Sequence, residues 1–334
     1  MKIISCVSYH GSGSSAVTDL LSECSSVYNM TNYEFRFIHD LDGVADLEYH
    51  LVDNFNRHNS GHALKRYKWL VDYYSNHFMV KRYEPFFNNL WKKISYEYID
   101  ELTDFKFHGS WQYDYYDRGA LFSFFFKLPQ RVMARTFWKN YPDKTIDLLF
   151  NEITYASHPS RTKFLELTKN YTSRLFSEAN RLSLPFITVD QVLPSSNIAR
   201  HMRYFDDIYA VIVDRDPRDV FILSKYFWKS PIVPKDVKTF CKWFRYTRST
   251  QKKELVNDQR IKLIQFEDLI YQYENTKNDL LSWLGVSLSD HSNRLKHFNP
   301  DISKKNTALW KNSAFAKEAR LIEQELAEFL YRGL

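Results

Sequence analysis

The sequence has few cysteines and no pattern typical of a metal site. Its 334 residues include three cysteines, Cys6, Cys24 and Cys241. They lie too far apart for the paired spacing of a zinc site, and an odd, sparse set of cysteines does not make a disulfide framework. We therefore expect no metal and a reducing compartment.

Long apolar runs are also lacking. The longest stretch, at residues 121–126, is much shorter than the run of about 18 residues that a membrane-spanning helix needs. The first expected strand begins at residue 2, which leaves no space for a signal peptide before it. We expect no integral membrane segment.

A strong charge of one sign is missing too. The formal net charge is +6, from 46 basic and 40 acidic residues. No basic repeat and no RNA-binding signature accompany this mild excess. The composition thus argues against nucleic acid as a partner, while it is compatible with an anionic nucleotide or an acidic glycan.

The most informative motif is a short apolar strand, residues 3–7, that runs into a glycine- and serine-rich turn. Gly11 and Gly13 permit backbone angles closed to other residues, and Ser14 or Ser15 can cap the helix that follows. Several amides and the positive end of a helix dipole would then converge on one point. This arrangement predicts a cradle for an anionic group.

The same motif lacks the lysine of the nucleotide-binding pattern GxxxxGK[ST], because Gly13 is followed by Ser14. A conventional ATPase is therefore disfavoured. On this segment alone an ordinary strand–turn–helix connection, with the serines serving only as caps, stays open.

A second strand end carries charge. Residues 208–214 read as a central parallel strand and are followed by Arg215, Asp216 and Arg218. Arg215 leaves the strand where parallel α/β sheets bind ligands, so we expect it to contact a phosphate. For Arg218 we favour a solvated turn with local ion pairs, and Asp216 or Asp219 can cap the next helix.

Four segments together resemble the sulfotransferase family, which transfers a sulfuryl group from 3′-phosphoadenosine 5′-phosphosulfate (PAPS) to a hydroxyl or amine. They are the turn at residues 9–15, the strand end at 215–219 with Ser224, the segments at 264–269 and 280–286, and the basic loop at 298–311. The resemblance implies one α/β domain over residues 1–334. Its fold would be three-layered and P-loop NTPase-like, with a central parallel sheet of about five strands.

The resemblance also implies a set of nucleotide contacts and no metal. The residues expected to hold the 5′-phosphosulfate are Gly11, Ser12, Gly13, Ser14 and Ser15. Arg215 and Ser224 are expected at the 3′-phosphate, and Lys304 and Lys305 in a loop that closes over the nucleotide.

Two positions depart from the family pattern. The family usually has Lys or Arg where this chain has Gly11, and Ser224 lies nine residues after Arg215, where eight is usual. If no cation stands at position 11, the charge on the bridging oxygen must be met by other groups. His10, a nearby lysine and the loop amides are the candidates.

The base is assigned through the same resemblance. Glycan-modifying members place a glutamate at the end of the second strand, and Glu34 fits that place, with Arg36 beside it and Asp190 at a third strand end. We expect Glu34 as base and Arg36 and Asp190 as acceptor contacts. Other candidates for the base are His10, Glu152, His158 and Asp190. An edge strand with its charges in water is the alternative for Glu34 and Arg36.

Residues 45–185 look helical and rich in aromatic side chains, and we interpret them as an insertion within the domain. Its aromatics are more readily housed in a core than on a ligand platform, although the family builds its acceptor pocket from such variable segments. Animal glycan sulfotransferases carry a membrane anchor, so its absence leads us to expect a cytoplasmic bacterial enzyme.

The expected reaction is sulfuryl transfer from PAPS to a saccharide hydroxyl, with 3′-phosphoadenosine 5′-phosphate as product. Two alternatives remain from other classes. One is a P-loop kinase, which would need ATP and Mg²⁺, and the other is a non-catalytic relative that binds a nucleotide or glycan.

Overall fold

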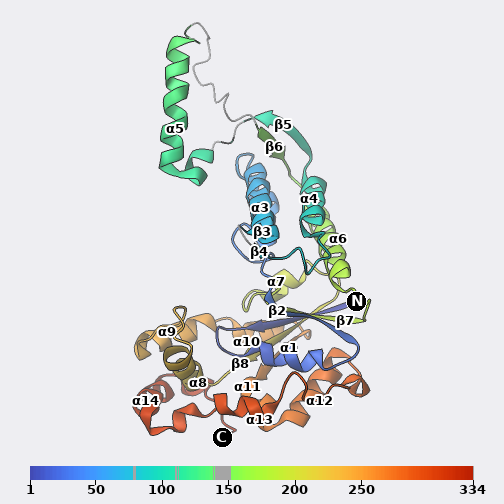
Figure 1. The fold of residues 1–334 in the computed structure, drawn as a ribbon, viewed down its shortest axis with the longest axis vertical. Coiled ribbons are helices and arrows are strands. Elements are labelled where there is room, and N and C mark those ends of the chain that lie inside the picture. The colour runs from blue at the N-terminus through green and yellow to red at the C-terminus, as the bar shows by residue number, and fades with distance from the viewer. Residues whose placement is uncertain (78–79, 110, 112, 138, 140–151, 334) are drawn as a thin grey trace. The chain divides into compact units, whose positions relative to one another are not determined.

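The computed structural model describes residues 1–77, 80–109, 111, 113–137, 139 and 152–333. Its central element is a five-stranded parallel sheet. The strands lie in the order β2-β7-β1-β8-β9, and each pairs with its neighbour in parallel (Figure 1). Their bounds are β1 Lys2–Ser8, β2 Val27–Glu34, β7 Phe186–Asp190, β8 Ile208–Asp214 and β9 Ile261–Gln265.

The apolar runs of the sequence occupy the middle of this sheet. β1 and β8 have neighbours on both sides, and Ile4, Cys6 and Val211 are fully buried. Continuous apolar runs suit strands that are covered on both faces. β2 is an edge strand, and the chain continues from its end through the buried Phe35 and Phe37.

Helices flank both faces of the sheet. The apolar sides of α1 (Ser14–Ser22), α11 (Phe266–Tyr271) and α12 (Tyr273–Leu284) form one core with β1 and β8. α7 (Ile198–Met202) lies on the opposite face (Figure 1). The expected α/β fold with a central parallel sheet of about five strands is therefore confirmed.

The segments that follow β8 and β9 are mostly helical. The elements are α8 Pro217–Ile222, a π-helical turn Leu223–Phe227, α9 Val237–Thr247, α10 Gln251–Asn257, α13 Pro300–Ser303 and α14 Ala316–Glu325. Short 3₁₀ turns cover Leu288–Asp290, Lys304–Asn306, Leu309–Lys311, Ser313–Phe315 and Ala327–Phe329. α8, α9 and α14 share a second apolar core.

The chain divides into two compact units. The sheet unit comprises residues Met1–His39 and Thr172–Leu334, and the helical unit comprises Asp40–Tyr171. The sequence placed the insertion at 45–185, so the helical unit starts earlier and ends earlier than that range. Its end falls within α6 (Arg161–Ala179), whose last turns belong to the sheet unit.

The helical unit has its own elements. They are α2 Val44–Glu48, a π-helical turn Tyr49–Asp53, α3 Asn59–Ser75, β3 Asn76–His77, β4 Val80–Lys81, α4 Trp91–Leu102, β5 Phe105–Gly109, α5 Asp114–Thr136 and β6 Glu152–Ala156. Large aromatic side chains fill its core, and Tyr67, Tyr83, Phe87, Trp91 and Tyr98 are fully buried. Much of the aromatic content of this segment is thus structural. None of the helices in the described part of the chain is long and apolar enough to cross a bilayer.

Candidate active site

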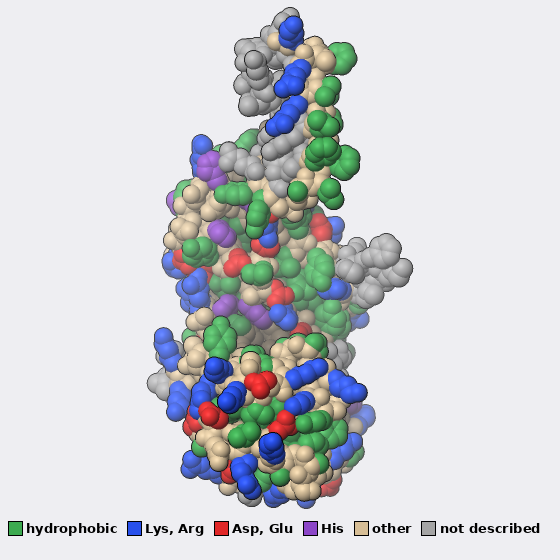
Figure 2. Space-filling view, turned by 90° about the vertical axis from the view of Figure 1, so that its left-hand side faces the viewer, with side chains coloured by type: hydrophobic (Ala, Val, Ile, Leu, Met, Phe, Trp, Pro, Cys, Tyr) green, Lys and Arg blue, Asp and Glu red, His purple; other side chains and the backbone are tan. Residues whose placement is uncertain are grey.

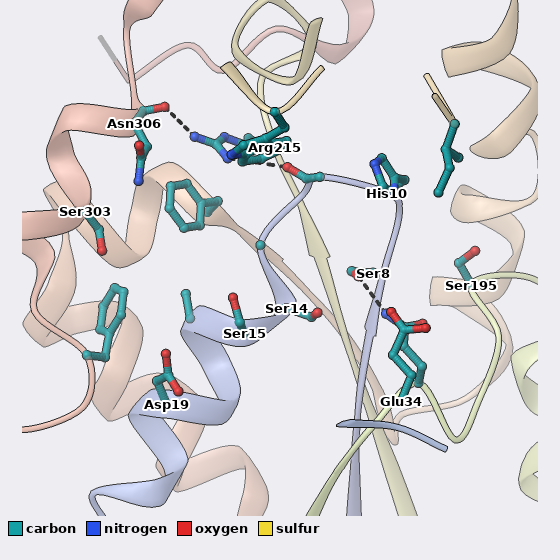
Figure 3. Close-up of a pocket in the computed structure, with 18 of the residues that line it drawn as sticks. Ser8, His10, Ser14, Ser15, Asp19, Glu34, Ser195, Arg215, Ser303 and Asn306 are labelled. Atoms are coloured by element: carbon teal, nitrogen blue, oxygen red, sulfur yellow. Dashed lines mark hydrogen bonds between the residues drawn. The ribbon is translucent and has the colours of Figure 1, made fainter. Parts of the chain in front are cut away.

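A cavity of about 690 Å³ lies in the sheet unit, at the carboxyl ends of the parallel strands. The loop after β1, the first turn of α1 and the residues that follow β2, β7 and β8 contribute to its wall. Ligands of open α/β sheets bind at this edge, because the loops that leave the strands meet there. Figure 3 shows Arg215, Ser303 and Asn306 on one side of the loop, and His10, Glu34 and Ser195 on the other.

The loop between β1 and α1 depends on its two glycines. Gly11 and Gly13 have φ angles of 79° and 97°, which glycine adopts without strain. A Cβ atom on Gly13 would lie 2.7 Å from the ring of Phe266, and one on Gly11 would lie 3.0 Å from Trp228. Two aromatic rings therefore pack directly against the loop backbone, so a side chain at either glycine would collide with a ring.

Ser12 holds the loop together from inside. Its side chain is fully buried, and its hydroxyl lies 2.6 Å from the carbonyl oxygen of Val213 and 2.8 Å from that of Tyr9. Its backbone N–H also donates to the carbonyl of Tyr9. Both polar groups of Ser12 are thus engaged within the protein, and Ser12 shapes the loop instead of lining the cavity.

The first turn of α1 opens into the cavity. Gly13, Ser14 and Ser15 line it, and Gly13 is the N-cap residue. The prediction that Ser14 or Ser15 caps this helix is wrong, because the left-handed Gly13 starts the helix one residue before them. The described residues provide no side-chain cap here, and no acidic residue lies in the first turn. The N–H groups and the helix dipole are therefore directed at whatever enters the cavity.

Arg215 follows β8 directly and reaches the other side of the loop. Its guanidinium donates to the carbonyl oxygens of Gly11, at 3.4 Å, and of Asn306, and it lies 4.4 Å from the ring centroid of Phe266. Its Nε is buried and has no hydrogen-bond partner among the described residues. Burial lowers the pKa of this guanidinium, which means that its charge is poorly solvated.

Ser224 provides a second buried donor near Gly11. Its hydroxyl has no partner in the described part of the chain, and it lies 3.7 Å from where a Cβ of Gly11 would be. Ser224 does not line the cavity, because Trp228 packs on the same side of Gly11. Buried polar groups without partners are rare in proteins, so two of them beside one loop call for an explanation.

The helix after β8 accounts for the unusual spacing of Ser224. α8 continues into the π-helical turn Leu223–Phe227, which includes Ser224. A π-helical turn holds about one residue more than an α-helical turn. Ser224 is the second residue of this wider turn, and its hydroxyl lies beside Gly11.

The charged residues after Arg215 are structural. Asp216 caps α8 by accepting from the N–H of Arg218, and it also pairs with the guanidinium of Arg218 at 2.7 Å. The expected local ion pair exists, but Arg218 is buried instead of solvated, beneath the ring of Trp310. Asp219 accepts from the N–H groups of Ala308 and Leu309 and so anchors the C-terminal loop.

The C-terminal loop presents different residues from those predicted. Ser303 and Asn306 line the cavity, whereas Lys304 and Lys305 are exposed and lie outside its lining. Lys304–Asn306 form a 3₁₀ turn, in which residues three apart lie on the same side. Ser303 and Asn306 therefore share the inner side, and the two lysines face away from it. The sequence prediction chose the two lysines for their positive charge and did not include the polar residues Ser303 and Asn306 beside them.

On the opposite side of the loop, Glu34 and Arg36 both line the cavity. Their side chains are about half exposed and form an ion pair of 3.7 Å. Glu34 is the last residue of the edge strand β2, so the edge-strand interpretation is correct for its position. Glu34 thus lies both at the end of an edge strand and in the wall of the cavity. Its interpretation as an edge-strand residue is therefore compatible with a place in the site.

Asp190 ends β7 and pairs in register with Glu34 across the sheet. Burial, with a further contribution from the charge of Glu34, raises the pKa of Asp190 to about 7, while the Ser14 hydroxyl and the Gln191 N–H oppose the shift. Oδ1 of Asp190 is buried without a partner among the described residues. Asp190 thus stands behind the first turn of α1 as a carboxyl group that titrates near neutrality.

His10 lines the cavity beside Glu34. Its Nε2 lies 3.0 Å from the hydroxyl of Ser230. Burial lowers the pKa of His10, and the charge of Glu34 only partly offsets this effect. The lowered pKa favours the neutral imidazole, which can donate one hydrogen bond and accept another but carries no positive charge.

The remaining candidates for the base belong to the helical unit. Glu152 pairs with Lys65 at 2.6 Å and with Arg118 at 3.4 Å. His158 stacks on Phe55 with ring centroids 3.6 Å apart. Both are engaged in contacts within that unit. The described residues of the chain contain no group of three or more His, Cys, Asp or Glu placed to hold a metal ion.

Sequence reasoning missed two aromatic residues of the cavity, Trp228 and Phe266. Phe266 follows β9 and packs on both Gly13 and Arg215, and Trp228 follows the π-helical turn. Nothing in their local sequence marks them as site residues. Only the position of Phe266 at the end of a parallel strand could have singled it out.

Comparisons with known proteins give a limited likeness. No model of a known protein family matches the chain, and no curated protein matches its sequence. The similar solved structures include three sulfotransferases. The sulfotransferase domain of the Synechococcus PCC 7002 olefin synthase is 14% identical with a TM-score of 0.43, and the match covers 97% of this chain and 93% of that one.

Two mycobacterial sulfotransferases match less well. STF9 from Mycobacterium avium is 14% identical with a TM-score of 0.37 over 98% of this chain and 75% of that one. STF1 from Mycobacterium tuberculosis H37Rv is 13% identical with a TM-score of 0.33 over 92% and 76%. Scores and identities this low do not assign a function. The function must come from the cavity itself.

Proposed function

We propose that the protein is a sulfotransferase that binds PAPS in this cavity and transfers the sulfuryl group to a hydroxyl of a saccharide. One observation carries the proposal: the loop between β1 and α1 has an anion-binding feature on each side. On one side is the uncapped first turn of α1, and on the other are the unpartnered Nε of Arg215 and hydroxyl of Ser224. A nucleotide with two separate phosphate groups fits such a pair, whereas ATP carries its phosphates in one chain.

The residues present fit each part of the donor. The amides and hydroxyls of Ser14 and Ser15 suit the 5′-phosphosulfate, because an anion at a helix N-terminus gains both hydrogen bonds and dipole attraction. Arg215 suits the 3′-phosphate, since a guanidinium donates in a planar fork to phosphate oxygens. The buried hydroxyl of Ser224, which lies beside Gly11 and has no partner among the described residues, suits the same phosphate as a second donor. Ser303 and Asn306 contribute from the C-terminal loop in place of the expected lysines.

The chemistry follows from these positions. When bound, PAPS supplies the sulfuryl group and leaves as 3′-phosphoadenosine 5′-phosphate. Glu34 accepts the proton of the acceptor hydroxyl, whose oxygen forms a bond to sulfur while the bond from sulfur to the bridging oxygen breaks. The amides at the start of α1 then stabilise the negative charge that develops on the 5′-phosphate. His10 donates a hydrogen bond to the bridging oxygen from the side of the cavity where Glu34 lies. The proposed reaction needs no metal.

The acceptor is the finer part of the proposal. Arg36, His39, Gln191 and Ser195 line the cavity beyond Glu34 and are polar, as expected for a wall that faces sugar hydroxyls. Asp190, expected as an acceptor contact, is buried behind this wall and does not line the cavity, so we do not include it among the acceptor contacts. The expectation of a bacterial, cytoplasmic enzyme rests on the family resemblance alone.

Calorimetric titration without added metal tests the donor site. We expect 3′-phosphoadenosine 5′-phosphate to bind more tightly than ADP or ATP, and Arg215→Ala to weaken it by about 100-fold while ADP changes little. Ser224→Ala should weaken the same ligand by about tenfold. Arg260→Ala is the matched control, because Arg260 pairs with Asp258 before β9 and does not line the cavity.

Each contrary result has a definite meaning. Preference for ATP, with a requirement for Mg²⁺, would replace the proposal with a P-loop kinase. Equal loss of the bisphosphate and of ADP in Arg215→Ala would remove Arg215 from the 3′-phosphate. Tight binding of the bisphosphate with no transfer from PAPS to any saccharide in a broad acceptor screen would favour a non-catalytic binding protein.

A further inference from the structure

Helix α5 exposes an apolar stripe to solvent. Gly119, with φ 83° and ψ 178°, interrupts the helix, and the segment after it is helical to Thr136 with Pro129 in its interior. In that segment the exposed apolar side chains are Leu121, Phe124, Phe125, Leu128 and Val132. Their spacing of three and four residues places them on one side of the helix. Leu121 is 77% exposed and Phe125 is 66% exposed, so this side is not covered by the described part of the protein.

Basic residues follow the same helix in their own row. Lys127, Arg131 and Arg135 recur every four residues, and residues 119–136 contain no acidic residue. The side chains of Arg131 and Arg135 are exposed. Figure 2 shows Lys and Arg side chains in a row beside hydrophobic ones along the helix at the top of the picture. The helix therefore combines an apolar side with a flank of purely positive charge.

The other long helices of the helical unit behave differently. In α4 the apolar side chains of Trp91, Ile94 and Tyr98 are buried, and its charged residues lie elsewhere on the helix. Interior packing thus does not explain the composition of α5. Spanning a bilayer does not explain it either, since α5 is not apolar enough to cross one.

We infer that α5 is a membrane-surface helix, which lies in the interface of a bilayer that carries anionic headgroups. Leucine and phenylalanine on one side and arginine along the flank are the composition of helices that lie at this depth. The absence of acidic residues favours a lipid surface over a folded protein partner, whose surface would mix both signs of charge. The occupant of the apolar stripe is then the boundary between headgroups and acyl chains.

The two sets of residues have separate roles in this binding. The apolar stripe supplies affinity by leaving water, and it works on any fluid bilayer. The basic row adds attraction to anionic lipids, about fivefold in partition coefficient for each residue close to the surface. Salt screens only the second contribution. Binding should therefore depend on both anionic lipid and ionic strength, without vanishing at high salt.

Flotation of the full chain with liposomes tests the inference. We expect binding to vesicles of about 70% phosphatidylcholine and about 30% phosphatidylglycerol in about 0.1 M NaCl, and weaker binding to phosphatidylcholine alone or in about 0.5 M NaCl. The triple variant Leu121→Gln, Phe125→Gln and Leu128→Gln should reduce the partition coefficient by at least about tenfold.

Charge variants provide a second, independent arm. Arg131→Glu with Arg135→Glu should abolish the preference for anionic vesicles, since two of the three positive charges become negative and repel the anionic headgroups. Two matched controls should bind as the wild type does. Leu182→Gln with Leu288→Gln removes exposed apolar side chains from the sheet unit, and Lys252→Glu with Lys253→Glu reverses exposed charges on α10.

A single-site probe reports contact directly. Because Cys6, Cys24 and Cys241 are all buried, a polarity-sensitive dye on Leu128→Cys labels one exposed thiol. Its emission should shift to the blue with anionic vesicles. Failure of the wild type to float, or equal flotation of the wild type and both α5 variants, would overturn the inference. A dimer in light scattering that the triple variant abolishes, with no vesicle binding, would assign the stripe to a second copy of the chain.

Discussion

Two sets of buried polar groups, one in each unit, differ in how their hydrogen bonds are satisfied. In the helical unit, the hydroxyl of Tyr171 bonds with those of Tyr67, at 2.9 Å, and Ser95, at 2.8 Å. In the sheet unit, Arg215 Nε, the Ser224 hydroxyl and Asp190 Oδ1 are buried without partners among the described residues. We call the first group the tyrosine cluster and the second the unpartnered groups of the sheet unit.

The two sets of groups should respond differently to substitution. A network in which every polar group has a hydrogen-bond partner stabilises the fold without a ligand. A buried polar group without a partner costs free energy until a ligand or water pairs with it. Changes in the tyrosine cluster should therefore alter stability and leave ligand binding intact. Changes to Arg215 or Ser224 should alter ligand binding and leave stability nearly intact, whereas Asp190, whose pKa is raised in the fold, also affects stability through its titration.

The largest effect is expected from Glu34→Gln. Loss of the general base should lower kcat for sulfuryl transfer by about 100- to 10,000-fold, because the amide cannot accept the acceptor proton. The free energy of unfolding should change little, since the side chain is half exposed. Rates with radiolabelled PAPS and urea denaturation measure the two quantities.

Glu323→Gln is the matched control for this change. Its side chain is 56% exposed, the same as that of Glu34, and it lies on α14 away from the cavity. An undiminished rate in Glu34→Gln would exclude Glu34 as base and return the role to Asp190 or His10.

The second effect concerns the tyrosine cluster. Tyr171→Phe removes an oxygen that is fully buried and leaves the hydroxyls of Tyr67 and Ser95 short of a partner. We expect a loss of about 1–3 kcal/mol in the free energy of unfolding, with unchanged affinity for 3′-phosphoadenosine 5′-phosphate. Tyr246→Phe, at a side chain that is 77% exposed, should change neither. A large loss of nucleotide affinity in Tyr171→Phe would break the division between the tyrosine cluster and the unpartnered groups of the sheet unit.

The smallest effect is a pH dependence at Asp190. Because its pKa is raised in the fold from 3.8 to about 7, its favourable contribution is complete below about pH 3.8 and is lost as the pH rises through 7. Asp190→Asn has no such titration. Relative to the wild type, the variant should therefore gain stability between pH 5 and pH 7.5, by a total of the order of 2 kcal/mol.

Asp258→Asn is the control for the pH experiment. Its hydrogen bonds with Arg260 lower the pKa of Asp258, so this group is ionised in both folded and unfolded chains above pH 5. Its difference from the wild type should stay constant over the same range. A flat difference for Asp190→Asn as well would mean that Asp190 is ionised in the folded protein throughout.

The sequence predicted those parts of the fold and site that local patterns decide. The strand, the two glycines and the helix at residues 3–22 are encoded by neighbouring residues, and so is the position of Arg215 after β8. Arg215 and the first turn of α1 accordingly stand at one cavity. The parallel sheet of five strands follows from the same apolar runs.

The other features of the site depend on contacts between segments that are far apart in the sequence, and local patterns do not reveal such contacts. The hydroxyl of Ser12 turns inward because the carbonyl of Val213, from β8, lies within reach. The choice of Ser303 and Asn306 over the two lysines depends on a 3₁₀ turn, whose direction no pattern reveals. Phe266 and Trp228 reach the glycines from distant segments. Charge was a misleading guide in the C-terminal loop because surface lysines are common everywhere.

The π-helical turn at Leu223–Phe227 has a consequence for how this site tolerates change in length. One additional residue in a strand would reverse the sides of every residue after it and ruin the sheet. The same addition in a helix widens one turn and leaves the flanking segments in place. We therefore expect that lengthening or shortening the helix after β8 by one residue would disturb the β1–α1 loop less than the same change in a strand would.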